Sequence, residues 1–134
     1  MKRKHCFITN SDRCRLGTLL STCERKAWGH ATSLSSLNAR LEDAKAIRFE
    51  ETPRCLVTMN STVELADVRS GERRRVTLAY PEDCELIPDS VSVFDSLGTQ
   101  LLGSEIGEVL DDGKRHFRVE EILYQPETAG DRHL

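Results

Sequence analysis

The hydrophobic period of this chain changes once, near Thr52-Pro53, and this change constrains the fold more than any other feature of the sequence. Before that point, apolar residues recur at three- and four-residue spacing, which predicts two amphipathic helices. From Val57 onward the period is two, as in strands with one buried face. We therefore expect an α+β fold that is helical first and stranded afterwards. The two helical stripes are Leu16, Leu19, Leu20 and Cys23, then Leu34, Leu37, Leu41, Ala44 and Ile47.

The helical part is expected to form a short antiparallel hairpin, because two amphipathic helices joined by a short loop usually pack in this way. Ser11 is the expected N-cap of the first helix, with Asp12 in its first turn. Thr32 and Ser33 are the candidate caps of the second helix. The second helical stretch should end at Thr52, because the residue before a proline avoids the helical region.

The second part of the chain predicts an antiparallel sheet with one short helix. Residues 96–103 are the expected helix, covering one end of the sheet, and the chain from Gln125 onward is an expected tail. The strands fall at residues 62–67 and 73–80 as a hairpin, at Val91 and Val93, and at 108–110 and 116–124 around a tight turn.

Two domains are expected, a helical-hairpin finger over residues 1–52 and a sheet domain over residues 53–134. The first carries ten Lys/Arg against six Asp/Glu, a net charge of +4, and the second nine against sixteen, −7. The two domains should therefore present differently charged surfaces. No apolar run approaches the roughly 20 residues that cross a bilayer. The basic start of the chain has no apolar segment behind it, so we expect a cytoplasmic protein without a signal peptide.

No residue pattern in the chain predicts catalysis. The five cysteines are an odd number without a CxxC pair, which argues against a disulfide framework. Metal binding by cysteines with His5 or His30 lacks the spacing of zinc ligands. There is also no phosphate-binding glycine loop and no Ser/His/Asp or Cys/His arrangement. We therefore expect no catalytic residues, no metal and no cofactor, in a protein that works by binding.

Four separated pieces of residues 57–134 follow one another in a recognisable order. They are Val57-Thr58-Met59-Asn60-Ser61, Leu78-Ala79-Tyr80-Pro81, Leu97-Gly98-Thr99-Gln100-Leu101-Leu102-Gly103 and Tyr124-Gln125-Pro126-Glu127-Thr128-Ala129-Gly130-Asp131. In this order they resemble the C-terminal domain of the GreA/GreB transcription elongation factor family. The last piece is typical of its Rnk branch, the regulators of nucleoside diphosphate kinase. The resemblance implies a coiled-coil finger followed by an FKBP-like sheet domain. It also implies a bacterial monomer that docks on RNA polymerase at the rim of the secondary channel.

The residues at the finger tip help to decide which activity of the family we expect from this chain. Gre factors place acidic residues there, which help to hold a second magnesium ion at the polymerase active site. The tip of this chain instead contains Glu24, Arg25, Lys26, Trp28 and His30. One carboxylate beside two cations is not the paired site that a hard divalent cation prefers. We therefore expect the protein to bind polymerase in competition with Gre-type factors without stimulating transcript cleavage.

The resemblance also implies which residues contact polymerase. They lie in a loop and at the helix start that follows it: Phe94, Asp95, Ser96 and Leu97. Other family members have an acidic or small residue and then a proline at this point, whereas this chain has Asp95-Ser96 and no proline. We expect Asp95 to be the acidic contact.

Three features allow both a functional and a structural interpretation. Trp28 either contacts a partner or fills the end of the hairpin. The basic triplet Arg73-Arg74-Arg75 either is a solvated edge strand or pairs with phosphate or with an acidic surface of polymerase. The net acidity of its domain argues against a general nucleic-acid site. Glu127 and Asp131 either clasp the finger or fix the interface between the domains, or they belong to a disordered tail.

Other functions remain as alternatives. One is a Gre-type cleavage factor that works through Glu24. Another is control of the level or activity of nucleoside diphosphate kinase by a separate route, as the name of the Rnk branch indicates. A third is prolyl isomerisation by the related sheet fold. Fold does not carry function, and a domain from a chain with 5% aromatic residues offers little for a proline pocket.

Overall fold

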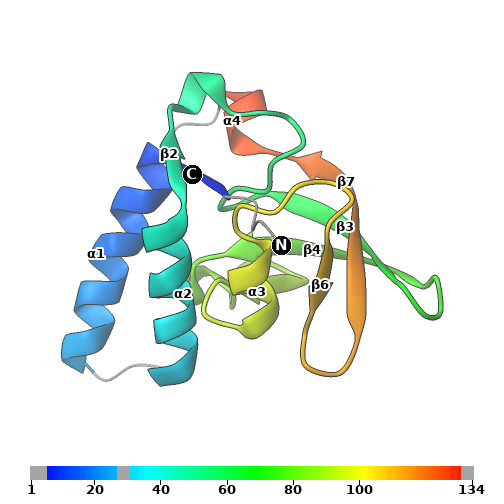
Figure 1. Ribbon diagram of the computed structural model, residues 1–134, viewed down its shortest axis with the longest axis horizontal. Coiled ribbons are helices and arrows are strands. Elements are labelled where there is room, and N and C mark those ends of the chain that lie inside the picture. Colours follow the sequence, from blue (N-terminus) through cyan, green and yellow to red (C-terminus); the bar gives the residue numbers. More distant parts are fainter. Residues whose placement is uncertain (1–5, 27–30, 131–134) are drawn as a thin grey trace.

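The computed structural model describes residues 6–26 and 31–130, without the side chains of residues 22–26 and 31–36. Two helices, α1 (Asn10–Lys26) and α2 (Ala31–Asp43), lie side by side and run in opposite directions (Figure 1). Short strands flank the pair, β1 (Phe7–Thr9) before it and β2 (Lys45–Ile47) after it. These strands pair in parallel, from Phe7 opposite Lys45 to Thr9 opposite Ile47. The expected helical hairpin is therefore present, with its two ends joined at the base.

The boundaries of both helices differ from those expected. The cap of α1 is Thr9 rather than Ser11, because the Asp12 backbone amide donates to the Thr9 hydroxyl at 3.2 Å. Helix α2 ends at Asp43 rather than near Thr52. The chain leaves the helix there because the Lys45 amide donates to the Cys6 carbonyl at 2.9 Å, which brings the next residues into β2. A turn of 3-10 helix, η1 (Phe49–Glu51), follows.

The sheet has the order β5-β4-β3-β7-β6 and contains every strand expected from the sequence. Its strands are β3 (Thr62–Asp67), β4 (Arg73–Ala79), β5 (Ser90–Ser92), β6 (Val109–Asp111) and β7 (His116–Tyr124). The expectation of a wholly antiparallel sheet is wrong at one edge, where β5 runs parallel to β4. The loop after β4, which contains the 3-10 turn η2 (Pro81–Asp83), is long enough to carry the chain back to the same end.

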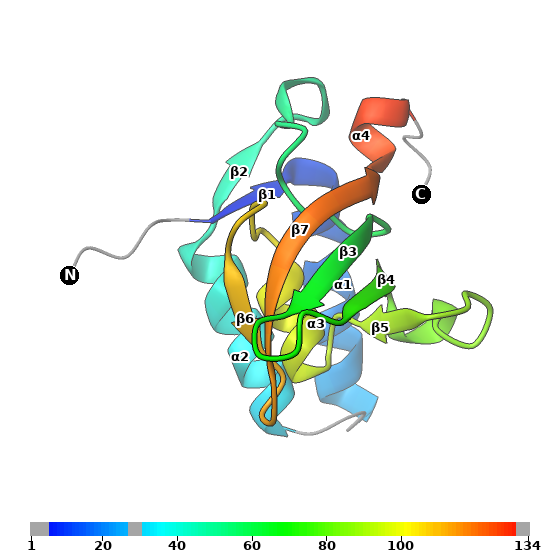
Figure 2. The ribbon, with the colours of Figure 1, turned by 90° about the vertical axis from the view of Figure 1, so that its right-hand side faces the viewer.

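The short helix expected over residues 96–103 is α3 (Ser96–Leu101). Figure 2 shows α1, α2 and α3 behind the sheet, so they cover one of its faces. Buried side chains of the helical half and of the sheet half belong to one hydrophobic core, which includes Ile8, Leu16, Leu37, Leu41, Val63, Leu65, Val76, Leu78, Leu101, Leu102 and Val119. Leu101 and Leu102 face this core, as expected.

The segment after β7 is packed rather than free, which corrects the expectation of a tail from Gln125 onward. Gln125 is buried, and its side-chain amide donates to the carbonyl oxygens of Pro53 at 2.8 Å and Leu56 at 2.7 Å. A one-turn helix, α4 (Pro126–Ala129), follows. The Thr58 hydroxyl donates to the Glu127 carboxylate at 2.6 Å, whereas Asp131 lies outside the described residues. The end of the described chain thus closes over the segment that begins the sheet half.

Candidate functional site

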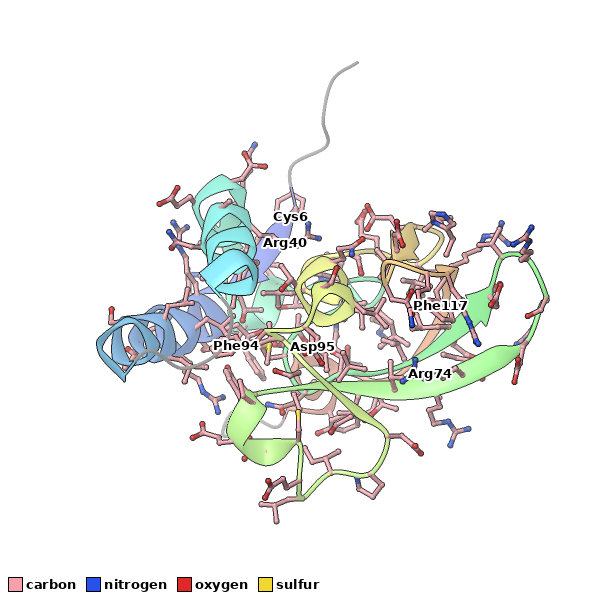
Figure 3. All side chains as sticks on the ribbon, turned by 90° about the horizontal axis from the view of Figure 1, so that it is seen from below. Cys6, Arg40, Arg74, Phe94, Asp95 and Phe117 are labelled. Atoms are coloured by element: carbon pink, nitrogen blue, oxygen red, sulfur yellow. The ribbon has the colours of Figure 1, made fainter. Side chains whose placement is uncertain are left out.

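The segment from Phe94 to Leu97, which we call the corner, follows β5 and includes the start of α3 (Figure 3). Asp95 and Ser96 are exposed, Phe94 is half-buried against the core, and Leu97 is buried with 6% exposure. The four residues proposed from the sequence are therefore together, but they do not play equal parts. Asp95 and Ser96 offer the accessible surface, and Leu97 supports it from inside.

Hydrogen bonds fix the shape of this corner. The Asp95 amide donates to the Ser92 carbonyl at 3.0 Å, and the Thr99 amide donates to the Asp95 carbonyl at 2.8 Å. The Thr99 hydroxyl adds a buried bond of 2.7 Å to the Val93 carbonyl. The Asp95 side chain does not cap α3, and no other described residue pairs with it. The carboxylate is thus held on a rigid support and stays available to a partner.

Gly98 allows α3 to lie directly on β5. A Cβ atom at this position would stand 1.9 Å from the Ser92 carbonyl oxygen and 2.7 Å from the carbon of the same carbonyl group. Both are backbone atoms, so a side chain could be accommodated only by moving the strand or the helix. The close approach sets the position of the exposed corner.

Arg40 of α2 holds the other end of α3, a role that the sequence interpretation missed. Its guanidinium donates to the Leu102 carbonyl at 2.5 Å and to the Gln100 carbonyl at 3.0 Å. A cation at a helix C-terminus also complements the helix dipole. The available signal was local: Arg40 is next to Leu41 and three residues after Leu37, at the border of the apolar stripe. Through Arg40, the helical hairpin positions the helix that carries Ser96 and Leu97.

A second buried polar group joins the two halves of the chain. Asp12 of α1 is 3% exposed, and its carboxylate accepts the Met59 amide hydrogen at 3.0 Å. Burial, with a smaller contribution from the nearby charge of Glu127, raises the pKa of Asp12 to about 7, against the lowering effect of the Met59 hydrogen bond. The sequence correctly predicted Asp12 in the first turn of the helix. It predicted a charge that stabilises the helix, however, and not a buried carboxylate that links α1 to the sheet half.

Tyr80 lies beside this buried carboxylate. Burial and the charge of Asp12 raise the pKa of its phenol, and the Arg15 guanidinium lies over its ring at 4.7 Å from the centroid. The phenol oxygen is buried and has no hydrogen-bond partner among the described residues. Burial also raises the pKa of Glu127, which accepts the hydrogen bond of Thr58. Two acidic side chains with raised pKa values therefore meet where the helices, the sheet and α4 join.

The finger tip is only partly described. Glu24, Arg25 and Lys26 form the end of α1, far from the β1–β2 pair (Figure 1), and nothing is described of their side chains. Trp28 and His30 lie outside the described residues. The proposed roles of these five residues stay predictions.

Within residues 6–26 and 31–130, no group of three or more His, Cys, Asp or Glu side chains is arranged to hold a metal ion. Four described cysteines are free thiols: Cys6, Cys14, Cys55 and Cys84. No helix in the described part of the chain is both long enough and apolar enough to span a membrane.

Residues 53–124 match the family model described as transcription elongation factor GreA/GreB, C-terminal domain. The chain belongs to the GreA/GreB family. The resemblance seen in the sequence is therefore confirmed, and the matched residues include every strand of the five-stranded sheet and α3.

Relatives extend the likeness beyond the sheet half. The chain is 35% identical over 136 residues to the regulator of nucleoside diphosphate kinase of Escherichia coli strain K12, covering 98% of both proteins. It is 36% identical over 90 residues to the transcription inhibitor protein Gfh1 of Thermus thermophilus, covering 61% of this chain and 58% of Gfh1. The first of these relatives is named as a regulator and the second as a transcription inhibitor.

A solved structure of the family has the same fold. The GreA/GreB elongation factor from Nitrosomonas europaea superposes with a TM-score of 0.76 at 31% identity. The superposition covers 89% of this chain and 99% of that one, so the helical hairpin and the sheet half are both included. The α+β architecture of this chain is thus a GreA/GreB fold.

Proposed function

We propose that this protein is a cytoplasmic transcription regulator that binds RNA polymerase at the rim of the secondary channel and competes there with Gre-type factors. The exposed, unpaired carboxylate of Asp95 on a rigid corner of a GreA/GreB sheet half is the observation that carries the proposal. Membership in a family of elongation factors, together with likeness to a transcription inhibitor, supports polymerase as the partner.

In this proposal, residues 53–134 form the docking domain, of FKBP-like type, and residues 1–52 form a coiled-coil finger directed at or into the channel. The protein acts as a monomer. Asp95 forms a charge-assisted hydrogen bond with a basic side chain of polymerase, and the exposed part of Phe94 adds apolar contact. A carboxylate held in place before binding loses little conformational entropy on association.

The protein does not stimulate transcript cleavage in this proposal. Stimulation requires oxygen ligands for a second metal ion, and the tip sequence supplies Glu24 with Arg25 and Lys26 directly after it. The two cations lower the local affinity for a divalent metal. The finger instead acts by occupying space at the channel, so its effect on transcription is steric and electrostatic.

The test is capture of the protein by immobilised core RNA polymerase, in the presence and absence of an excess of a Gre factor. We expect binding that the competitor displaces. Asp95→Asn should weaken binding by about tenfold, the loss expected for one charge-assisted hydrogen bond. Glu85→Gln is the matched control, because Glu85 is an exposed carboxylate of the same half outside the corner. Equal binding by wild type and Asp95→Asn would remove Asp95 from the contact. Binding that resists the competitor would place the protein elsewhere on polymerase.

A second candidate function is control of nucleoside diphosphate kinase by a separate route. The supporting observation is the likeness to a regulator of that kinase, which extends over 98% of both chains. Titration of the purified kinase with this protein, followed by calorimetry and by kinase activity, separates the two functions. Association or a change in kinase activity would favour direct control. If the kinase neither binds the protein nor changes its activity, transcription remains the route.

A further inference from the structure

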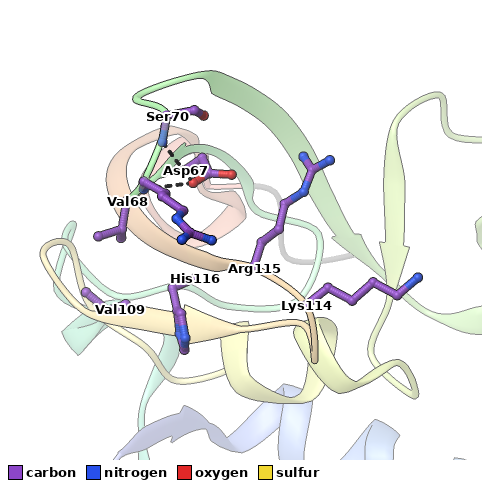
Figure 4. A pocket seen from close by; sticks show the side chains of 8 residues that line it. Asp67, Val68, Ser70, Val109, Lys114, Arg115 and His116 are labelled. Carbon is purple, nitrogen blue, oxygen red and sulfur yellow. Dashed lines mark hydrogen bonds between the residues drawn. The ribbon is translucent and has the colours of Figure 1, made fainter.

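Two turns lie side by side at one end of the sheet and carry a group of exposed cations. One joins β3 to β4 and the other joins β6 to β7, and the Val68 amide donates to the His116 carbonyl between them at 2.9 Å. A hollow of about 780 Å³ opens between the turns (Figure 4). We call this surface the basic end and define it by the cations that line the hollow, Arg69, Lys114 and Arg115.

The carboxylates within the turns are already engaged by backbone amides. The Asp67 carboxylate accepts the amides of Arg69 at 2.8 Å and Ser70 at 3.2 Å. The Asp112 carboxylate accepts the amides of Lys114 at 2.9 Å and Arg115 at 2.7 Å. These hydrogen bonds lower the pKa values of both aspartates, so both stay charged and both stabilise the turns. The backbone that carries Arg69, Lys114 and Arg115 is therefore well fixed.

Among the described residues, the three cations of the basic end form no close side-chain ion pair, although the charges of Arg69 and Arg115 act on Asp67 and the charge of Arg115 acts on Asp112. Other cations nearby differ, since Arg73 pairs with Glu64 at 2.5 Å and Arg118 lies 3.8 Å from Glu120. Strand β5 pairs only with residues 77–79 of β4, so the triplet at the start of β4 is exposed along an open edge, one of the two roles expected for it. The basic end thus offers separate, unpaired charges on a rigid support.

Apolar side chains stand among these cations. Val68 is 49% exposed and Val109 is 51% exposed, and both line the hollow. Figure 4 shows the two valines on one side of it, with Lys114 and Arg115 on the other. A surface that combines half-exposed aliphatic groups with free cations is suited to a partner that brings both aliphatic and acidic groups.

We propose that the basic end binds an acidic protein segment that contains aliphatic side chains, as an interaction surface additional to the corner at Asp95. In the complex, Lys114, Arg115 and Arg69 pair with carboxylates of the segment, and an aliphatic side chain enters the hollow against Val68 and Val109. Nucleic acid fits this surface less well. Among the described residues, no phenylalanine, tyrosine or tryptophan lines the hollow to stack on bases.

The test uses the full chain and three fluorescein-labelled probes in an anisotropy titration at low salt. The probes are a short peptide of Asp, Glu and Leu, the same peptide with Asn and Gln in place of the acids, and an oligothymidylate. We expect saturable binding of the acidic peptide, weakened by added salt because exposed charges are screened. The amide peptide and the oligothymidylate should bind at least about tenfold more weakly, because they lack the carboxylates or the aliphatic groups.

Variants locate the site. The pair Lys114→Glu and Arg115→Glu should weaken binding of the acidic peptide by about tenfold or more, and Val68→Ser by a smaller factor. Arg54→Glu is the matched control, because Arg54 is an exposed cation of the same half away from the basic end. Lys114→Gln with Arg115→Gln serves as a milder pair if the charge reversal disturbs folding. Tighter binding of the oligothymidylate, unchanged binding by the variant pairs, or the absence of saturable peptide binding would overturn the proposal. Polymerase capture by these variants is measured separately, so failure here is distinguishable from failure of docking at Asp95.

Discussion

Asp12 and Met59 lie 47 positions apart in the sequence and are joined by a hydrogen bond of 3.0 Å between the Asp12 carboxylate and the Met59 amide. The bond crosses from the first helix to the segment that begins the sheet half. Because the carboxyl is buried and its pKa is raised to about 7, this joint gains or loses a charge near neutral pH. The connection between finger and sheet is therefore sensitive to protonation.

Stability should fall as the pH rises from about 4 to about 7. The pKa of Asp12 is about 7 in the folded chain against 3.8 for an ordinary aspartate, so the folded state holds the proton more tightly. Its contribution is complete below about pH 4 and is lost as the pH rises through about 7. One such proton changes the free energy of unfolding by at most about 1.4 kcal/mol per pH unit. Urea unfolding at a series of pH values measures the slope.

Asp12→Asn tests the origin of that slope. The asparagine oxygen can still accept the Met59 hydrogen bond but does not titrate. We expect a smaller slope rather than a flat one, because the raised pKa of Glu127 has the same sign. Asp95→Asn, at an exposed position, should keep the full slope. An unchanged slope in Asp12→Asn would show that Asp12 is not the titrating group.

Gly98→Ala should destabilise the chain by about 2 kcal/mol or more, because the added methyl group meets the Ser92 carbonyl and forces backbone movement. Gly17→Ala is the matched control in α1, where no atom lies within 4 Å of the new Cβ apart from the neighbouring residues and the adjacent helix backbone. This control should stabilise by about 0.5–1 kcal/mol through helix propensity. Denaturant midpoints of the two variants give the comparison, and equal shifts in the same direction would contradict the close approach.

Arg40→Met should cost about 1–3 kcal/mol of stability, because it leaves two carbonyl oxygens at the end of α3 without their donor. Amide hydrogen exchange in α3 should accelerate more than exchange in β3. Arg48→Met is the control, since Arg48 forms only an exposed pair with Glu51 and should change stability by less than about 0.5 kcal/mol. If exchange in α3 stays at the wild-type rate, Arg40 does not hold that helix.

Backtracked transcription complexes should show no additional cleaved RNA 3′ ends when this protein is added. The reason is the tip sequence, in which Glu24 is a lone carboxylate followed by two cations. A Gre factor added to the same complexes is the positive control, and its activity should fall as this protein is titrated in. Cleavage that depends on this protein and disappears in Glu24→Gln would instead establish a Gre-type cleavage factor.

Local patterns predicted the sheet half well. The alternation in residues 62–67 and the turn signals between strands gave β3, β4, β6, β7 and α3 close to their observed bounds. The end of α2 was not predictable in this way, because Ala44 and Ile47 fit a helical stripe as well as a short strand. Residues 45–47 form a strand and not a helix because they pair with β1, about 38 positions earlier in the chain. A local sequence pattern cannot show this distant pairing.

The residues of the candidate site likewise fall into those that the sequence predicted and those that it did not. Asp95 and its neighbours were found through a likeness between sequences, and the structure shows how exposed each one is. Arg40 and Asp12 were missed because their partners lie 62 and 47 positions away. A buried charge gives no signal in the sequence until the fold brings its partner beside it.

The parallel pair of β1 and β2 has a consequence for how chains of this kind diverge. It brings residues 7–9 and 45–47 together, so the helical segment between them starts and ends at one fixed base. Helical turns can be added to α1 and α2 in equal number without altering the base, Arg40, or the joint at Asp12. The length of the helical hairpin is therefore an adjustable quantity, and a lineage can lengthen or shorten it while the sheet half stays the same.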